Sequence, residues 1–337
     1  MSDIPEQDPN VAEHPIPGRE GILAPEDSLT TANGFGPSLL PEHFNTESGA
    51  TDSEPALFRS FYQPEILRPT RIPNFGHLSI LFVLIILGWL GAVALTYSAL
   101  HFHLFGVLTV DQAKTDIHYT LGSMVSMYLC TFGLCLFVFP LVWNEGFFAG
   151  LQWHGATAIR LRWRLLSAAV LCFALAMIDQ MVMPGPTNAP IDKLFQSRTD
   201  AWLLLIFGST FAPFFEETFF RGFLLPSLCT AWDWAMEKST GRRPRPLDAD
   251  GHPQWSIFAM VLGSALTSVP FALMHAEQIA HAVGPLMLLY CVSLILCTVR
   301  LATRSLAASV VVHASYNLLL FIIMLLGTGG FQHMEKM

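Results

Sequence analysis

Apolar stretches of 17 to 26 residues alternate with short polar segments along most of this chain, and charged residues, proline or glycine bound each stretch. A helix needs about 20 apolar residues to cross the roughly 30 Å hydrocarbon core of a bilayer. We therefore predict an all-α fold, a polytopic membrane helix bundle of about seven spans. The predicted spans are residues 78–100, 119–143, 165–183, 201–226, 256–274, 283–299 and 306–326.

The fourth stretch has an unusual length, because its helical pattern continues to about Met236. One span does not need so many residues. Proline is a common cause of sharp helix kinks, so we expect a kink at Pro213 or Pro226.

The first 75 residues differ from the rest of the chain. They are rich in Pro, Glu and Ser, with eight prolines in the first sixty residues. Such a composition cannot bury enough apolar surface to offset the entropy of ordering the chain. We predict a disordered acidic tail at residues 1–75, which lacks the pattern of a signal peptide. The membrane bundle is expected at residues 76–330.

The charges are distributed unevenly. Residues 1–60 hold eleven Asp or Glu against two Arg, whereas the remainder is close to neutral, with fifteen acids and sixteen bases. Nothing in this pattern resembles the basic patch of a nucleic-acid-binding protein. If the tail lies inside, twelve Lys or Arg, among them Arg300, flank the membrane on that side and four flank the other. This asymmetry predicts a multi-pass protein of the plasma membrane with a cytosolic tail.

The fourth span contains three charged residues, Glu216, Glu217 and Arg221. Thirteen Phe, Leu and Ile residues between positions 202 and 225 favour insertion by roughly 6 kcal/mol. The three charges oppose insertion by roughly 9 kcal/mol. This segment therefore needs polar partners inside the bundle. Ionisable residues within a membrane are functional-site candidates by default.

Helical geometry separates the two glutamates. Glu217 and Arg221 lie at positions i and i+4, in the order that favours an ion pair. Glu216 is rotated by about 100° from Glu217 and has Phe220 at its own i+4 position. It therefore needs a partner from another helix, or it accepts a proton as a general base does. The alternative is that both acids serve only to hold the bundle together.

Two later spans supply further polar residues. The fifth ends with Phe271 and His275 one turn apart, and the seventh places His313 and Asn317 one turn apart. A single membrane histidine is more often a structural hydrogen-bonding group. Two histidines, an asparagine and an unpaired glutamate on three spans instead favour a site. We expect these side chains to meet in one polar cavity, with His275 near the outer end of its helix.

These residues form three motifs that resemble those of the CPBP intramembrane proteases, the family of CAAX prenyl endopeptidases and bacteriocin-processing (Abi) proteins. That family carries EExxxR, FxxxH and HxxxN or HxxxD on successive membrane helices. The motifs here are EETFFR, FALMH and HASYN, in the same order and with the same internal spacing. The resemblance covers about residues 200–320, and no motif of the family is matched before them.

The resemblance implies an intramembrane endopeptidase that hydrolyses a peptide bond with an activated water and without a covalent intermediate. The family roles carried over are as follows: Glu216 is the general base, His275 helps to hold the water, His313 and Asn317 stabilise the oxyanion, and Glu217 with Arg221 fixes the first motif. Preorganised donors in a dry site stabilise an oxyanion strongly, which agrees with these roles. The implied partners are membrane lipids and a peptide or lipidated-peptide substrate that enters from the membrane.

Other assignments remain open at this point. No cofactor is favoured, but a zinc ion held by Glu216, His275 and His313 is an alternative, because catalytic zinc takes about three protein ligands. The sequence contains neither HExxH nor GxSxG. The rival function is a proton-coupled transporter or channel that uses the buried Glu, His and Asn. No internal repeat of the kind common in transporters supports it.

Overall fold

The computed structural model describes residues 73–106, 109–114, 116–186, 190, 194–195, 197–241 and 254–332. Within these ranges the regular elements are all helical. The predicted tail, up to residue 72, lies outside the described residues.

The helices of the described part follow one another with short connections. Their bounds are α2 (Phe75–His101), α3 (Val110–Ala113), α4 (Ile117–Trp143), α5 (Phe147–Gly150), α6 (Gly155–Arg160), α7 (Arg162–Val182), α8 (Arg198–Ile206), η2 (Phe207–Phe211), α9 (Ala212–Glu217), η3 (Thr218–Leu224), α10 (Leu225–Thr240), α11 (Ile257–Met274), α12 (Val283–Thr303) and α13 (Leu306–Gly327).

Seven helices of the described part are long and apolar enough to cross a membrane. They are α2, α4, α7, the continuous helix from α8 to α10, α11, α12 and α13. The predicted all-α fold and the seven predicted spans are therefore confirmed.

Polar side chains fix the ends of several spans. Asn74, Asp116, Ser256 and Ser305 each accept a hydrogen bond from a backbone N–H in the first turn of the helix that follows. Such caps satisfy amide groups that have no partner inside the helix. At the end of α10, Gly241 adopts a left-handed conformation with φ of 65°, which terminates the helix.

The fourth span is a single helix of 43 residues, from Arg198 to Thr240, and extends past Met236. It leaves α geometry twice, in the π-helical turns η2 and η3. Pro213 lies just after η2 and Pro226 just after η3. Each of the two prolines at which the sequence suggested a kink thus follows a π-helical turn, and such turns are frequent at functional sites.

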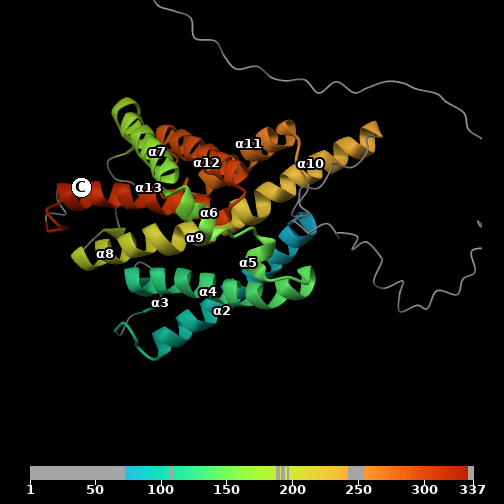
Figure 1. The fold of residues 1–337 in the computed structure, drawn as a ribbon. Helices are drawn as coiled ribbons and strands as arrows, with labels where there is room; N and C mark the ends of the chain where they lie inside the picture. The colour runs from blue at the N-terminus through green and yellow to red at the C-terminus, as the bar shows by residue number, and fades with distance from the viewer. Residues whose placement is uncertain are drawn as a thin grey trace, which may run out of the picture. The chain divides into compact units, whose positions relative to one another are not determined.

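The long fourth span lies between two groups of helices. On one side α2 packs against α4, and the two helices lie next to each other in Figure 1. On the other side α7, α12 and α13 pack against one another, and α11 packs against α12. The fourth span contacts α2 through η3 and α10, and it contacts α13 through η2 and α9. Residues 216–221 are therefore surrounded by helices from both groups.

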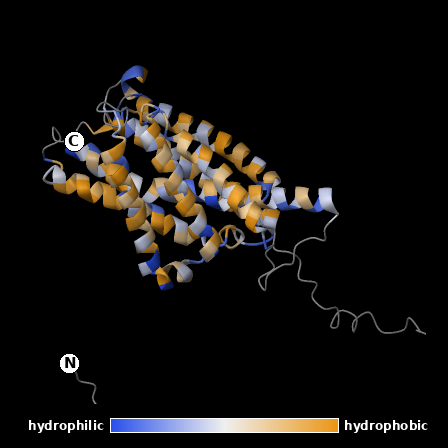
Figure 2. Cartoon of the chain, turned by 90° about the horizontal axis from the view of Figure 1, so that it is seen from above, coloured by the Kyte–Doolittle hydropathy of each residue, from blue (hydrophilic) through white to orange (hydrophobic). Residues whose placement is uncertain are grey.

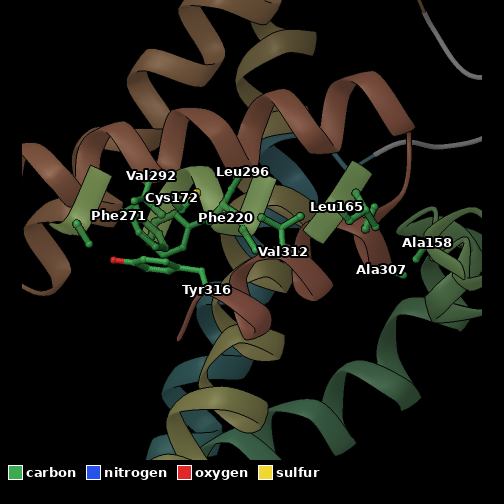
Figure 3. Packing of buried hydrophobic residues seen from close by; sticks show 13 residues of the cluster. Ala158, Leu165, Cys172, Phe220, Phe271, Val292, Leu296, Ala307, Val312 and Tyr316 are labelled. Carbon is green, nitrogen blue, oxygen red and sulfur yellow. The ribbon is translucent and has the colours of Figure 1, made fainter. Parts of the chain in front are cut away.

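The core between these helices is apolar. In Figure 3, Phe220 of η3 packs among Phe271 of α11, Leu296 of α12 and Val312 of α13. A second cluster joins α2 and α4 to Phe223 of η3.

The outward-facing surface of the spans is also apolar. Orange, hydrophobic positions cover much of the helices in Figure 2, and residues such as Val83 and Ile86 are more than half exposed. Soluble proteins rarely expose so large an apolar surface. Together with the seven spans, it identifies a multi-pass membrane protein whose outer surface faces lipid.

Candidate active site

The buried ion pair of the fourth span forms the centre of the site. The Nη1 atom of Arg221 donates a hydrogen bond of 2.9 Å to Oε1 of Glu217, and both side chains are fully buried. The predicted i, i+4 pair is therefore present. Burial of this pair explains how the segment can carry two full charges inside an apolar bundle.

Arg221 has further partners on two other helices. Its Nη2 atom donates to the backbone oxygen of Ser293 at 3.0 Å and to Oγ of Ser293 at 2.6 Å. The guanidinium group also lies 4.5 Å from the ring centroid of Phe271, a distance typical of a cation–π contact. Arg221 thus links the fourth span to α12 and α11. Sequence reasoning missed Ser293, because a small serine in an apolar helix carries no distinguishing pattern.

His313 of α13 binds the same carboxylate. Its Nδ1 atom lies 3.0 Å from Oε1 of Glu217. Because that oxygen already accepts a hydrogen bond from Arg221, the carboxylate is ionised and the proton between His313 and Glu217 belongs to Nδ1. The other ring nitrogen, Nε2, is then directed toward Glu216.

His275 has a similar orientation. It caps the C-terminal end of α11, and its Nδ1 atom lies 3.0 Å from the backbone oxygen of Phe271. A carbonyl oxygen only accepts, so Nδ1 of His275 carries the proton and Nε2 is left facing the site. The ring of Phe271 lies 5.3 Å from the ring of His275 and 5.8 Å from that of His313, and so packs against both.

Glu216 faces both histidines. Its Oε2 atom lies 3.9 Å from Nε2 of His275 and 3.9 Å from Nε2 of His313. Within the described part of the chain, this oxygen is buried and has no hydrogen-bond partner. A separation of 3.9 Å is too long for a direct hydrogen bond, but a water molecule can bridge polar groups at such distances. The structure thus brings Glu216, His275 and His313 together from three spans.

Asn317 is placed differently. Its Nδ2 atom donates a hydrogen bond of 2.7 Å to the backbone oxygen of Gly208, in η2. One of its two amide hydrogens is therefore engaged by the fourth span, and one is left for another acceptor.

A cavity of about 310 Å³ borders Glu216. It is lined almost entirely by apolar side chains, from α2, α4, the fourth span, Phe147 of α5 and Met274 at the end of α11. Tyr128 of α4 lines it too, and its ring stacks on Phe215 with 4.4 Å between centroids. We expected these side chains to meet in one polar cavity. The structure instead has a small polar cluster beside a cavity that is apolar.

The donor set of Glu216, His275 and His313 has the chemistry of a zinc site, since two imidazole nitrogens and a carboxylate are common zinc ligands. Their orienting hydrogen bonds, from Nδ1 to Glu217 and to Phe271, also resemble those around metal-bound histidines. However, Glu216 lies 3.9 Å from each nitrogen, wider than the roughly 3.4 Å that zinc bond lengths imply. No group of three His, Cys, Asp or Glu among the described residues is arranged closely enough to hold a metal ion.

Arg300 is a residue whose position the sequence did not reveal. We counted it among the twelve bases of the membrane flanks, but its side chain is buried in the protein, with 4% exposed. Removing it leaves eleven bases against four, so the predicted asymmetry of charge persists. Sequence alone cannot distinguish a buried arginine near a helix end from one in a loop.

The site lies within a segment that matches a protein family. Residues 198–319 match the family described as Type II CAAX prenyl endopeptidase Rce1-like. The match includes all six polar residues of the three motifs, from Glu216 to Asn317, and Phe271. Comparison of the chain with curated proteins and with solved structures gave no match.

Proposed function

We propose that this chain, whose residues 198–319 belong to the Rce1-like family of type II CAAX prenyl endopeptidases, hydrolyses peptide bonds inside the membrane with a water activated by Glu216. The observation that carries the proposal is the convergence of three spans on one point. Oε2 of Glu216 faces Nε2 of both His275 and His313, and Glu217, in its buried pair with Arg221, binds Nδ1 of His313.

The first step is activation of water. A water molecule between Glu216 and His275 can donate one hydrogen to the carboxylate and the other to Nε2 of His275. Glu216 takes the first proton as the water oxygen forms a bond to the substrate carbonyl carbon. When the carbon–nitrogen bond breaks, Glu216 returns this proton to the departing amine. No side chain forms a covalent bond to the substrate.

The second requirement is a donor for the oxyanion. Nδ1–H of His313 is engaged by Glu217, so His313 can donate from Nε2 only when it carries protons on both nitrogens. The remaining amide hydrogen of Asn317 is the second candidate donor. Such preorganised donors are worth about 10²–10³ in kcat each.

The substrate is a peptide or lipidated peptide that reaches the site through the membrane. The apolar cavity beside Glu216 supports this, since a large apolar group can occupy it while the peptide bond lies at the carboxylate. Membrane lipids are the other partners, and no surface for nucleic acid is expected. We assign the catalytic core to about residues 200–320, within a bundle at residues 76–330 that follows the tail.

The orientation follows from charge. Eleven bases flank one side of the membrane against four on the other, which supports a plasma-membrane protein with a cytosolic N-terminal tail. Protease digestion of sealed, inverted vesicles tests it, because only a cytosolic tail would be cleaved there.

The decisive experiment compares purified wild-type protein with the variant Glu216→Gln. The variant keeps the size of the side chain and loses only the proton acceptor. We expect it to fold normally and to show no cleavage of prenylated or unmodified peptides that the wild-type protein cleaves. A Glu216→Gln variant that cleaves peptides at the wild-type rate would exclude Glu216 as the base. Proton-driven transport by a wild-type protein that cleaves no peptide would instead favour a transporter or channel.

The same preparation distinguishes the two hydrolytic mechanisms. If a metal is used, Glu216, His275 and His313 would hold it, and it would supply a more acidic bound water. We favour the metal-free route because the spacing is wide for zinc, and we expect activity to survive chelation. Loss of activity on chelation, with recovery on addition of zinc and one zinc per active chain, would overturn this assignment.

A further inference from the structure

Arg300 is a buried cation that the proposed mechanism does not use. It lies in α12, and its Nη2 atom donates to Oε1 of Gln152 at 2.7 Å and to the backbone oxygen of Leu151 at 3.4 Å. Its Nε atom donates to the backbone oxygen of Arg221 at 3.3 Å. These three acceptors are all uncharged. A buried charge is costly, so its retention among neutral acceptors calls for a physical reason.

The backbone oxygen of Arg221 needs such a donor. In an α-helix its partner is the N–H of Leu225, but that group donates to Phe220 instead, because η3 is π-helical. In a π-helix its partner is the N–H of residue 226, but residue 226 is proline and has no N–H. The two irregularities together leave the Arg221 oxygen without an intrahelical partner. Arg300 supplies the missing hydrogen bond from α12.

The other proline of the fourth span has the same arrangement. The N–H of Ala212 donates to Phe207, because η2 is π-helical. Pro213 lacks an N–H, so the oxygen of Gly208, five residues earlier, is left without its usual donors. Asn317 of α13 donates to this oxygen. A π-helical turn followed by proline thus frees one carbonyl on each side of Glu216 and Glu217, and a side chain from another helix binds each one.

We propose that Arg300 is a positioning residue of the active site, which acts by binding the carbonyl that Pro226 frees. The turn that it holds carries Arg221, whose guanidinium binds Glu217, and Glu217 in turn orients His313. Contacts with Leu151 and Gln152 anchor Arg300 to the segment between α5 and α6, outside the matched family segment. The proposal rests on the proposed peptidase function and adds a residue to it.

The test asks whether replacing Pro226 by alanine restores the activity that is lost in an Arg300 variant, with replacement of Pro213 as the control. Arg300→Met removes all the donors of this side chain, and Pro226→Ala supplies a backbone N–H at the position whose π-helical partner is the Arg221 oxygen. We expect Arg300→Met to lower kcat at least tenfold with KM changed less than threefold. The double variant Arg300→Met with Pro226→Ala should recover most of that kcat. Pro226→Ala alone should stay within twofold of wild type.

The control uses the other proline. Pro213→Ala adds an N–H to the same helix at the wrong carbonyl, so it should not rescue Arg300→Met. The proposal would be overturned if Arg300→Met had wild-type kcat. It would also be overturned if Pro226→Ala did not restore the kcat of Arg300→Met, or if Pro213→Ala restored it equally well. If Arg300→Met does not accumulate, accumulation and unfolding temperature replace kcat as the readout. Recovery of both by Pro226→Ala but not by Pro213→Ala, in a double variant that is active, supports the proposal. Absence of this recovery overturns it. A wild-type protein that cleaves no peptide would instead be a failure of the peptidase function.

Discussion

At the scale of single residues, Glu216 and Glu217 are neighbours in the chain with different environments. Glu217 is fully buried and binds both Arg221 and His313, so its charge is used to orient other groups. Glu216 borders the apolar cavity, and its Oε2 atom faces two histidine nitrogens without a direct hydrogen bond. The rotation of about 100° between successive helical residues is enough to separate the paired acid, Glu217, from the proposed general base, Glu216.

Replacement of His313 tests this division at the residue scale. His313→Ala removes one proposed oxyanion donor, so kcat for peptide cleavage should fall by about 10²–10³ with little change in KM. His281→Ala is the control, because His281 is an exposed loop histidine that pairs with Glu277. Steady-state kinetics of both purified variants check the prediction. Equal activity of the two variants would remove His313 from the mechanism.

At the scale of elements, the fourth span combines the functional groups with the irregularities of its backbone. Its two π-helical turns flank the short α9 that ends at Glu217, and η3 itself carries Arg221. Hydrogen bonds to α12 and α13 hold these turns, a buried one through Arg221 and a part-buried one through Asn317. The geometry of this helix therefore depends on side chains of its neighbours as well as on its own hydrogen bonds.

The buried ion pair should be needed for stability. Arg221→Leu leaves the Glu217 carboxylate without its guanidinium partner in a dry site, with His313 as its remaining contact, at a cost on the order of 3–5 kcal/mol. We expect this variant to accumulate poorly in the membrane. The double change Glu217→Gln with Arg221→Leu should recover part of the protein, because no uncompensated charge remains. Quantitative immunoblots of membrane fractions measure both, and normal accumulation of Arg221→Leu would show that the pair is not structural.

Asn317 should have two separable roles. Asn317→Ala leaves the Gly208 oxygen without its donor, a loss of about 0.5–1.5 kcal/mol for a part-buried hydrogen bond. It also removes a proposed oxyanion donor, with a loss of about 10²–10³ in kcat. Adding Pro213→Ala returns a backbone N–H to the helix, so the unfolding temperature should recover while kcat stays low. Recovery of both would mean that Asn317 acts only on the helix.

At the scale of the whole molecule, the proposed catalytic residues and much of the cavity lining come from different parts of the chain. The family match covers residues 198–319, which hold all the motif residues. Residues of α2 and α4, together with Phe147 of α5, also line the cavity and precede the match. The first two spans therefore shape the space that a substrate would occupy.

This arrangement predicts that α4 influences substrate preference. Thr131→Phe adds a ring to the cavity wall, so KM should rise severalfold for peptides with a large apolar group and change less for small ones. Thr120→Phe is a matched control, because Thr120 lies on the same helix and lines a separate cavity near α3. Competition kinetics between the two peptide classes measure the effect. An unchanged preference in Thr131→Phe would show that substrates do not use this cavity.

The sequence by itself determined the features that depend on local spacing. Hydrophobic length predicted the seven spans, because a bilayer of fixed thickness demands about 20 apolar residues per helix. The pair Glu217–Arg221 followed from the i, i+4 geometry of one helix. The three motifs singled out Glu216, His275, His313 and Asn317 as the polar groups of otherwise apolar spans.

Only the tertiary structure decided how these helices meet. The 3.9 Å distances from Glu216 to His275 and His313 depend on the packing of three spans, which no spacing within one helix fixes. The same holds for Arg300, which the sequence could not distinguish from a loop arginine, and for Asn317, whose partner lies 109 residues away at Gly208. A backbone carbonyl freed by proline becomes a binding site only where packing brings a donor to it, and that donor is absent from the local sequence.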